Sequence, residues 1–99
     1  MRVVVTGASG AVGRHVADRL IGRQNIEVIA LDRASSDGVI QFELQTGDLT
    51  EYLRSGDSLV HLAATPAGFA GDGGAAKADR QLAERALDAA TRALSLIHI

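Results

Sequence analysis

Three glycines spaced three residues apart, Gly7, Gly10 and Gly13, constrain most strongly what this chain can fold into. A β-branched run, Val3 to Val5, comes immediately before them, and a helical pattern of apolar residues follows. The arrangement predicts a strand, a tight turn and a helix whose N-terminus faces the turn. Because a helix N-terminus carries unpaired N–H groups and a partial positive charge, we expect this turn to hold phosphate.

Each glycine has a separate expected role in such a turn. Gly7 allows the sharp turn out of the strand, Gly10 lets the backbone approach a pyrophosphate, and Gly13 lets the helix pack close to the sheet. The turn is not a Walker A loop, because Gly13 is followed by Arg14 and His15 rather than by a Lys-Ser/Thr pair. The spacing therefore favours a dinucleotide over a nucleoside triphosphate.

The rest of the chain alternates strand and helix patterns. Further strands are predicted over residues 26–31, 40–44 and 59–64, with a turn or two of helix over residues 50–54. Residues 96–99 either start a fifth strand or, with residues 94 and 95, form a non-native tail. This alternation predicts an α/β fold, a Rossmann-type parallel sheet of about four to five strands with flanking helices.

Two amphipathic helices are expected beside this sheet. The first carries one apolar stripe and ends near Gly22 and Asn25. The second runs over about residues 75–94, after a glycine-rich loop over residues 66–74. The apolar residues expected to face the sheet are Val12, Val16, Leu20 and Ile21 in the first helix, and Leu82, Ala86, Ala90 and Ala93 in the second.

Composition excludes several classes of function. The chain has 99 residues, a net charge of −2 and no cysteine. A complete dinucleotide fold needs roughly 150 residues, so residues 1–93 fit the N-terminal part of one domain. The basic residues are spread out, which argues against nucleic acid, and no disulfide or metal site is predicted. The sequence shows no signal peptide and no membrane-spanning run, so we expect a cytoplasmic protein.

Acidic residues follow two of the predicted strands. Asp32, which ends the second, can accept hydrogen bonds from both adenosine ribose hydroxyls and repels a 2′-phosphate, although Arg33 beside it could pair with one. NAD is therefore favoured over NADP. Asp48 follows the third strand and can meet the adenine amino group while Leu49 packs on the ring. Alternatively, Asp48 is an N-cap for the short helix.

The end of the fourth strand reads His61-Leu62-Ala63-Ala64. The small residues Ala63 and Ala64 permit a close approach of the backbone to a cofactor. His61 lies between apolar residues within a predicted strand, which favours a structural histidine over an acid or base.

These motifs together resemble the NAD-dependent epimerase/dehydratase family of the extended short-chain dehydrogenases/reductases. The resemblance covers residues 1 to about 93 and implies a Rossmann domain that binds NAD(P), with a nucleotide sugar as a frequent substrate and a homodimer in the complete protein. It implies cofactor contacts at four places. These are the glycine turn (Gly7, Ser9, Gly10, Ala11, Val12 and Gly13), the ribose site (Asp32 and Arg33), the adenine site (Asp48 and Leu49) and the nicotinamide side (Leu62, Ala63 and Ala64).

The family's catalytic residues are missing from this chain. The resemblance requires a tyrosine followed four residues later by a lysine, as acid/base and its partner. The only tyrosine is Tyr52, with Gly56 four residues later, and the only lysine is Lys77. The asparagine usual near the start of the long helix corresponds to Asp79 or Arg80. Two hypotheses follow: the chain is the cofactor-binding part of a longer enzyme, or it is a non-catalytic dinucleotide-binding module.

Overall fold

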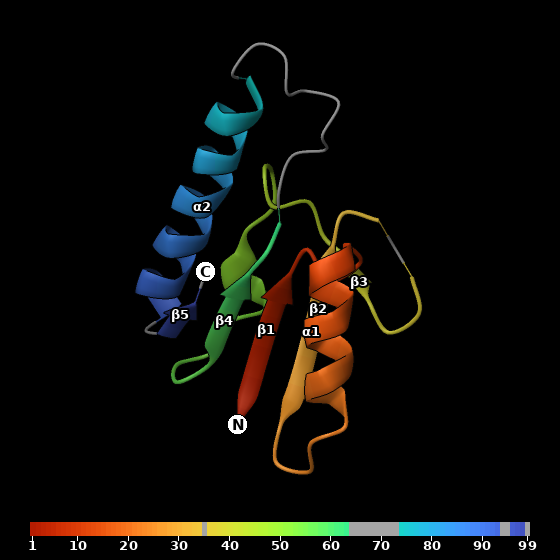
Figure 1. Ribbon diagram of the computed structural model, residues 1–99. Coiled ribbons are helices and arrows are strands. Elements are labelled where there is room, and N and C mark those ends of the chain that lie inside the picture. Colours follow the sequence, from red (N-terminus) through yellow and green to blue (C-terminus); the bar gives the residue numbers. More distant parts are fainter. Residues whose placement is uncertain (35, 64–73, 94–95, 99) are drawn as a thin grey trace.

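The computed structural model describes residues 1–34, 36–63, 74–93 and 96–98. They form a five-stranded sheet in the order β3-β2-β1-β4-β5, and every pair of neighbouring strands is parallel (Figure 1). The strands are β1 Arg2–Thr6, β2 Glu27–Asp32, β3 Ile40–Gln41, β4 Ser58–His61 and β5 Leu96–His98. The helices are α1 Ala11–Ile21, the 3₁₀ helix η1 Leu49–Glu51 and α2 Gly74–Ala93. The expected Rossmann-type topology is confirmed.

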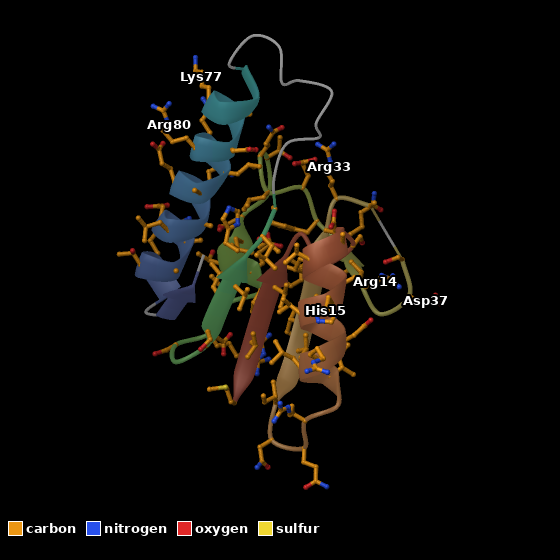
Figure 2. All side chains as sticks on the ribbon, in the orientation of Figure 1. Arg14, His15, Arg33, Asp37, Lys77 and Arg80 are labelled. Carbon is orange, nitrogen blue, oxygen red and sulfur yellow. The ribbon has the colours of Figure 1, made fainter. Side chains whose placement is uncertain are left out.

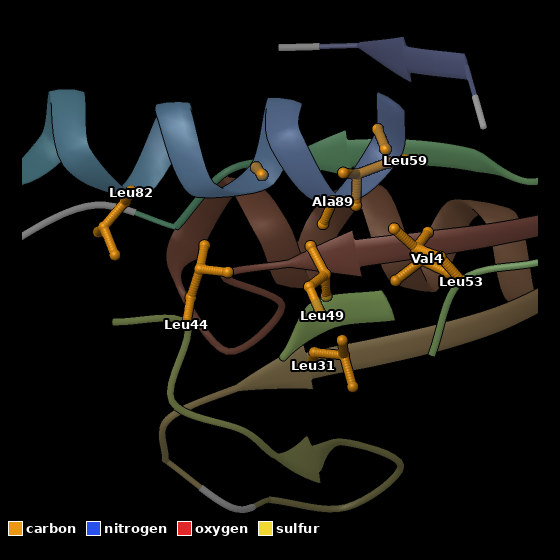
Figure 3. Close-up of a cluster of buried hydrophobic side chains, with 10 residues drawn as sticks. Val4, Leu31, Leu44, Leu49, Leu53, Leu59, Leu82 and Ala89 are labelled. Atoms are coloured by element: carbon orange, nitrogen blue, oxygen red, sulfur yellow. The ribbon is translucent and has the colours of Figure 1, made fainter. Parts of the chain in front are cut away.

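Alternate residues of the central strand face opposite layers. Val4 belongs to a core that contains α2 and η1 residues, and Val3 and Val5 belong to a second core on the side of α1. All three valines are at most 5% exposed, as expected of a strand covered on both faces. Figure 3 shows the first core, where Ala89 of α2 lies beside Leu59 of the sheet and Leu82 lies nearer to Leu44.

The helix α1 faces the sheet with only part of the predicted stripe: Val16 and Leu20 are half-buried, and Leu20 packs against the second core. Val12 and Ile21 are 64% and 58% exposed, so the predicted stripe is wrong at both positions. Gly13 and Ala17 are the buried residues of this helix. Small residues four apart let the helix backbone come close, and the larger side chains are left at the margins. The predicted end of the helix is confirmed, because Gly22 is its C-cap.

The predicted third and fourth strands are shorter in the structure. The third covers only Ile40–Gln41, although the alternation extends to residue 44. Phe42 leaves the sheet and packs edge-on against Tyr52, with ring centroids 5.3 Å apart. The fourth ends at His61 rather than Ala64, which lies outside the described residues.

The C-terminal helix agrees with its prediction. It begins at Gly74 and ends at Ala93, and its residues Leu82, Ala86 and Ala90 are buried on the sheet. The following strand β5 pairs in parallel with β4, with Leu96 opposite Ser58. The glycine-rich segment over residues 66–73 lies outside the described part of the chain. Among the helices that the structure describes, none is long and apolar enough to cross a membrane.

Candidate dinucleotide site

The glycine turn lies at the edge of the sheet where β1, β2 and β4 all end (Figure 1). Gly7 has a φ of +71°, a backbone conformation that favours glycine. A Cβ on Gly7 would lie 2.6 Å from the carbonyl carbon of Leu62 and 2.7 Å from the nitrogen of Ala63. Gly7 is therefore needed both for the turn and for close contact with the segment after β4.

Gly13 is required by the turn itself. A Cβ there would lie 1.9 Å from the carbonyl oxygen of Gly7 and 3.0 Å from the Cα of Ala8. The close contact is thus between the helix and the turn, whereas the sequence suggested contact between helix and sheet.

Gly10 differs from both neighbours. It is exposed, has φ −70° and ψ 167°, and a Cβ there would come no closer than 3.4 Å to the chain. These are ordinary values for any residue, so the fold described here does not itself require glycine at position 10.

The N-terminus of α1 opens at this turn. Gly10 is its N-cap and makes no side-chain cap, and the first helical hydrogen bond runs from Arg14 N–H to Gly10 O at 2.8 Å. The N–H groups of Ala11 and Val12 precede that bond, and both residues are exposed. Such groups attract anions.

Asp32 connects the end of β2 to the glycine turn. Its Oδ2 accepts a hydrogen bond of 2.8 Å from the backbone N–H of Ser9. The Ser9 hydroxyl lies 3.2 Å from that of Ser36, which in turn accepts a 3.5 Å bond from Arg14. Residues separated by more than 20 positions in the sequence thus form one polar corner.

Two basic side chains flank this corner. Figure 2 shows Arg14 projecting from α1 and Arg33 at the upper end of the sheet. Arg33 is exposed, and its carbonyl oxygen accepts a 3.2 Å bond from Gln41. The structure therefore places carboxylate, hydroxyl and guanidinium groups beside the glycine turn.

Asp48 and Leu49 behave mainly as structural residues. The Oδ1 of Asp48 accepts bonds from the N–H and the hydroxyl of Thr50, at 3.0 and 2.6 Å, and so caps η1. The bond from the Thr50 hydroxyl is the main cause that lowers the pKa of Asp48, with Arg92 adding to it. Leu49 is 2% exposed and belongs to the core. The side chain of Leu49 is thus buried in the core and does not present the exposed surface that was predicted to pack on adenine.

An arginine that was not predicted as a site residue supports the same segment. Arg85 of α2 donates from Nε to Leu44 O at 2.6 Å and from a terminal nitrogen to Gly47 O at 2.8 Å. A hollow of about 140 Å³ lies beside this contact, lined by Thr46, Gly47, Asp48, Leu49, Arg85, Asp88, Ala89 and Arg92. The sequence does contain a signal for this contact. Arg85 follows the buried Leu82 by three residues and so lies beside it, at the margin of the apolar stripe of the helix.

The end of β4 carries a buried polar pair. His61 is 5% exposed, and its Nδ1 lies 2.8 Å from Oγ1 of Thr6. Burial lowers the pKa of His61, and the carboxylate of Asp79 in α2 opposes that shift without cancelling it. The prediction of a structural histidine fits this placement. Leu62 and Ala63, which follow it, are half-buried beside Gly7.

The lowered pKa of His61 predicts a pH-dependent stability. Below its ordinary pKa of 6.5 the unfolded chain takes up a proton that the folded chain resists. The contribution of His61 is thus fully present above about pH 6.5 and is lost as the pH falls toward the folded-state pKa. Urea unfolding of wild type and His61→Asn at several pH values should show this loss only in wild type. The same dependence of the free energy of unfolding on pH in both proteins would contradict the prediction.

The tyrosine and the lysine of the chain lie apart from each other. Tyr52 follows η1, and its ring packs against Phe42. Lys77 is exposed near the start of α2, where Figure 2 also shows Arg80. Among the described residues no group of histidine or acidic side chains could hold a metal ion.

Comparison with known proteins agrees with this geometry. The chain is 43% identical over 63 residues to the UDP-2-acetamido-2,6-beta-L-arabino-hexul-4-ose reductase of Pseudomonas aeruginosa, which is 64% of this chain and 14% of that protein. Among solved structures, MoeE5 in complex with UDP-glucose and NAD aligns with a TM-score of 0.81 and 23% identity, over 98% of this chain and 36% of that one. The UDP-N-acetylglucosamine 4-epimerase from Bacillus cereus aligns with a TM-score of 0.77 and 27% identity, over 93% of this chain and 34% of that one.

The chain therefore spans about a third or less of the length of these proteins. Residues 3–98 match the family model described as the NAD dependent epimerase/dehydratase family, which is nearly the whole chain. With the five-stranded parallel sheet and the glycine turn in place, this match shows that the chain belongs to the NAD-dependent epimerase/dehydratase family.

Proposed function

We propose that this chain binds NAD across the edge of the sheet where β1, β2 and β4 end, as the cofactor-binding part of an epimerase, dehydratase or reductase. The observation that carries the proposal is the 2.8 Å hydrogen bond from Ser9 N–H to Asp32. It brings a group suited to a ribose directly beside a turn suited to a pyrophosphate.

The residues present fit such a cofactor. Gly10 supports it, because the fold does not require a glycine at this N-cap position and a residue without a Cβ lets a pyrophosphate approach the backbone. In this proposal Gly7, Gly10, Ala11 and Val12 line the pyrophosphate, and Leu62, Ala63 and Ala64 lie on the nicotinamide side. The backbone at Asp48 and Leu49 faces adenine.

NAD is preferred over NADP because of Asp32. Its carboxylate would repel a 2′-phosphate, whereas the ribose hydroxyls of NAD can donate to it. Arg33 follows Asp32 directly and Arg14 donates to Ser36 of the same polar corner, so both guanidinium groups can soften this preference. NAD in the solved structure of MoeE5 supports the same choice.

The complete protein is proposed to act on a nucleotide sugar. The relatives named above act on or bind UDP-sugars, which supports this substrate class. When bound, the nicotinamide supplies hydride transfer, and a tyrosine and lysine outside these 99 residues would supply the proton transfer. We also propose a cytoplasmic location and a homodimer for the complete protein.

A second candidate function is a non-catalytic dinucleotide-binding module. The observation that favours it is that these 99 residues contain no Tyr-x-x-x-Lys pair, the one tyrosine, Tyr52, being packed against Phe42. Both candidates predict NAD binding by this chain and no turnover. They differ in whether a version extended to the length of the relatives oxidises or epimerises a UDP-sugar.

Replacing Asp32 by alanine should weaken NAD binding at least about tenfold, since buried hydrogen bonds to a charged group are each worth about 1.5–3 kcal/mol. Asp32→Asn should bind with intermediate affinity, because one oxygen still accepts from Ser9 while the charge is lost. Calorimetric titration with NAD and NADP measures both, and the preference for NAD should shrink in each variant.

Asp18→Ala is the matched control for this experiment. Asp18 is an exposed carboxylate in the later part of α1, about two helical turns from the glycine turn. Its loss should leave the affinity for NAD unchanged. Equal affinity of Asp32→Ala and wild type would remove Asp32 from the site.

A further inference from the structure

The buried hydroxyl of Thr6 is the centre of a small hydrogen-bond network. Thr6 ends β1, His61 ends β4, and the two are register partners in adjacent strands. Oγ1 of Thr6 lies 2.8 Å from Nδ1 of His61, 3.1 Å from the N–H of Leu62 and 3.3 Å from the N–H of Ala63. Thr6 and His61 are 2% and 5% exposed.

The donor count assigns the histidine tautomer. A hydroxyl oxygen has two lone pairs and one hydrogen. The N–H of Ala63 donates to Oγ1, and the N–H of Leu62 is shared between Oγ1 and the backbone carbonyl oxygen of Thr6, 3.1 Å from each. With two N–H groups directed at the oxygen, the hydrogen of the Thr6 hydroxyl is assigned to His61. Nδ1 of His61 therefore accepts, and the ring is neutral with its proton on Nε2. Asp79 of α2 is the charged residue acting on the ring within the described chain, and it faces a neutral imidazole.

The segment held by this network forms one wall of the glycine turn. The backbone of Leu62 and Ala63 approaches Gly7 so closely that a Cβ there would clash at 2.6–2.7 Å. On its other side the turn is held independently, by the Ser9 to Asp32 bond. The Thr6 network thus sets the distance between the phosphate-binding turn and the end of β4.

We propose that His61 is a positioning residue for the dinucleotide. As a neutral acceptor for the Thr6 hydroxyl, it holds the end of β4 against Gly7. This fixes the distance between the binding surface for the nicotinamide and the binding surface for the pyrophosphate. The inference rests on the proposed function and adds a role that the glycine turn and Asp32 do not provide. The bond from Ser9 to Asp32 holds the other side of the glycine turn without this network, so ligands that lack nicotinamide should lose much less affinity than NAD.

The test compares NAD with ADP-ribose, which keeps the adenine, the pyrophosphate and both riboses but has no nicotinamide. Titrations are made near pH 8, where His61 is neutral. His61→Leu, which removes the acceptor, should lose about tenfold in NAD affinity and less than about twofold in ADP-ribose affinity. His61→Asn, whose side-chain oxygen can accept in place of Nδ1, should restore NAD binding to within about threefold of wild type.

A second pair of variants covers the case in which His61→Leu fails to fold. Thr6→Val removes the hydroxyl and should reduce NAD affinity selectively, and Thr6→Ser should restore it. The tautomer is read directly from the imidazole ¹⁵N shifts of the wild-type chain, with the exposed His15 as internal reference. A non-protonated Nδ1 is expected for His61.

The failures of the two proposals are distinguishable. A wild-type chain that binds neither NAD nor ADP-ribose overturns the proposed function and, with it, this inference. Wild-type binding with equal losses for both ligands in His61→Leu would show that His61 serves the fold only, and would overturn the inference alone. A proton on Nδ1, or unchanged NAD affinity in both His61→Leu and Thr6→Val, would also overturn it.

Discussion

Gly13→Ala is expected to lower the free energy of unfolding by about 3 kcal/mol or more, a large part of the total stability of a domain of this size. The added Cβ would lie 1.9 Å from the carbonyl oxygen of Gly7 and 2.7 Å from its carbonyl carbon. Both are backbone atoms in a turn that is held by the Leu62 segment and by Asp32, so neither can move freely. Alanine usually stabilises a helix by about 1 kcal/mol over glycine, which is too little to offset this overlap.

Gly10→Ala and Gly22→Ala are matched controls with the same chemical change. At Gly22 nothing lies within 4 Å of the added Cβ and the backbone is helical, so the stability should be unchanged or slightly higher. At Gly10 the contact is 3.4 Å, so the loss should stay below about 1 kcal/mol. Urea unfolding separates the three variants. Equal stability of Gly13→Ala and Gly22→Ala would contradict the assigned contact.

Measurements of NAD affinity distinguish the role of Gly10 from that of Gly13. Gly10→Ala should keep the fold and lose at least about tenfold in NAD affinity, because its Cβ would occupy the space proposed for the pyrophosphate. A Gly10→Ala variant that binds NAD as wild type does would show that the cofactor does not approach the turn there. The pair therefore distinguishes a glycine needed by the fold from one needed by a ligand.

The sequence predicted those parts of the fold that depend on neighbours in the chain. Val3 to Val5 and the glycine spacing specify a strand, a turn and a helix without reference to distant residues, and the structure has all three. The buried face of α1 was predicted wrongly at Val12 and Ile21, which are exposed, although Leu20 of the predicted stripe packs against the core. The helix instead approaches the turn through Gly13 and Ala17, where only small residues fit.

Contacts between distant segments could not be read from the sequence. The bond from Ser9 to Asp32 joins residues 23 apart, and that from Thr6 to His61 joins residues 55 apart. Both depend on the order and register of the strands, which the hydrophobic pattern leaves undetermined. Position alone could suggest that Asp32 lies near the glycine turn, but not that it is bonded to it. The buried pair Arg2 and Asp57, at the opposite end of the sheet, was not foreseen for the same reason.

Asp57→Ala should destabilise the fold by about 3–5 kcal/mol, because it leaves the charge of a largely buried arginine without its main partner. The side chains of Asp57 and Arg2 are 5% and 15% exposed and form a direct ion pair. Oδ2 of Asp57 also accepts from Arg54 N–H at 2.8 Å, and Arg2 donates to Tyr52 O at 3.0 Å. The pair thus fastens β1 to the chain between η1 and β4. Guanidinium unfolding is unsuitable here because that salt screens charges, so urea is the denaturant of choice.

A double-mutant cycle tests whether this loss comes from the pair itself. Arg2→Met should also be destabilising, since the buried Asp57 carboxylate loses its ion pair and keeps the hydrogen bond from the Arg54 N–H. The combined variant Arg2→Met with Asp57→Leu removes both charges and should be more stable than the sum of the single losses predicts, because no unpaired charge remains. NAD affinity should stay unchanged in any folded variant, because the pair lies at the opposite end of the sheet from the glycine turn. Strictly additive losses would mean that Arg2 and Asp57 stabilise the fold separately, through Tyr52 and Arg54.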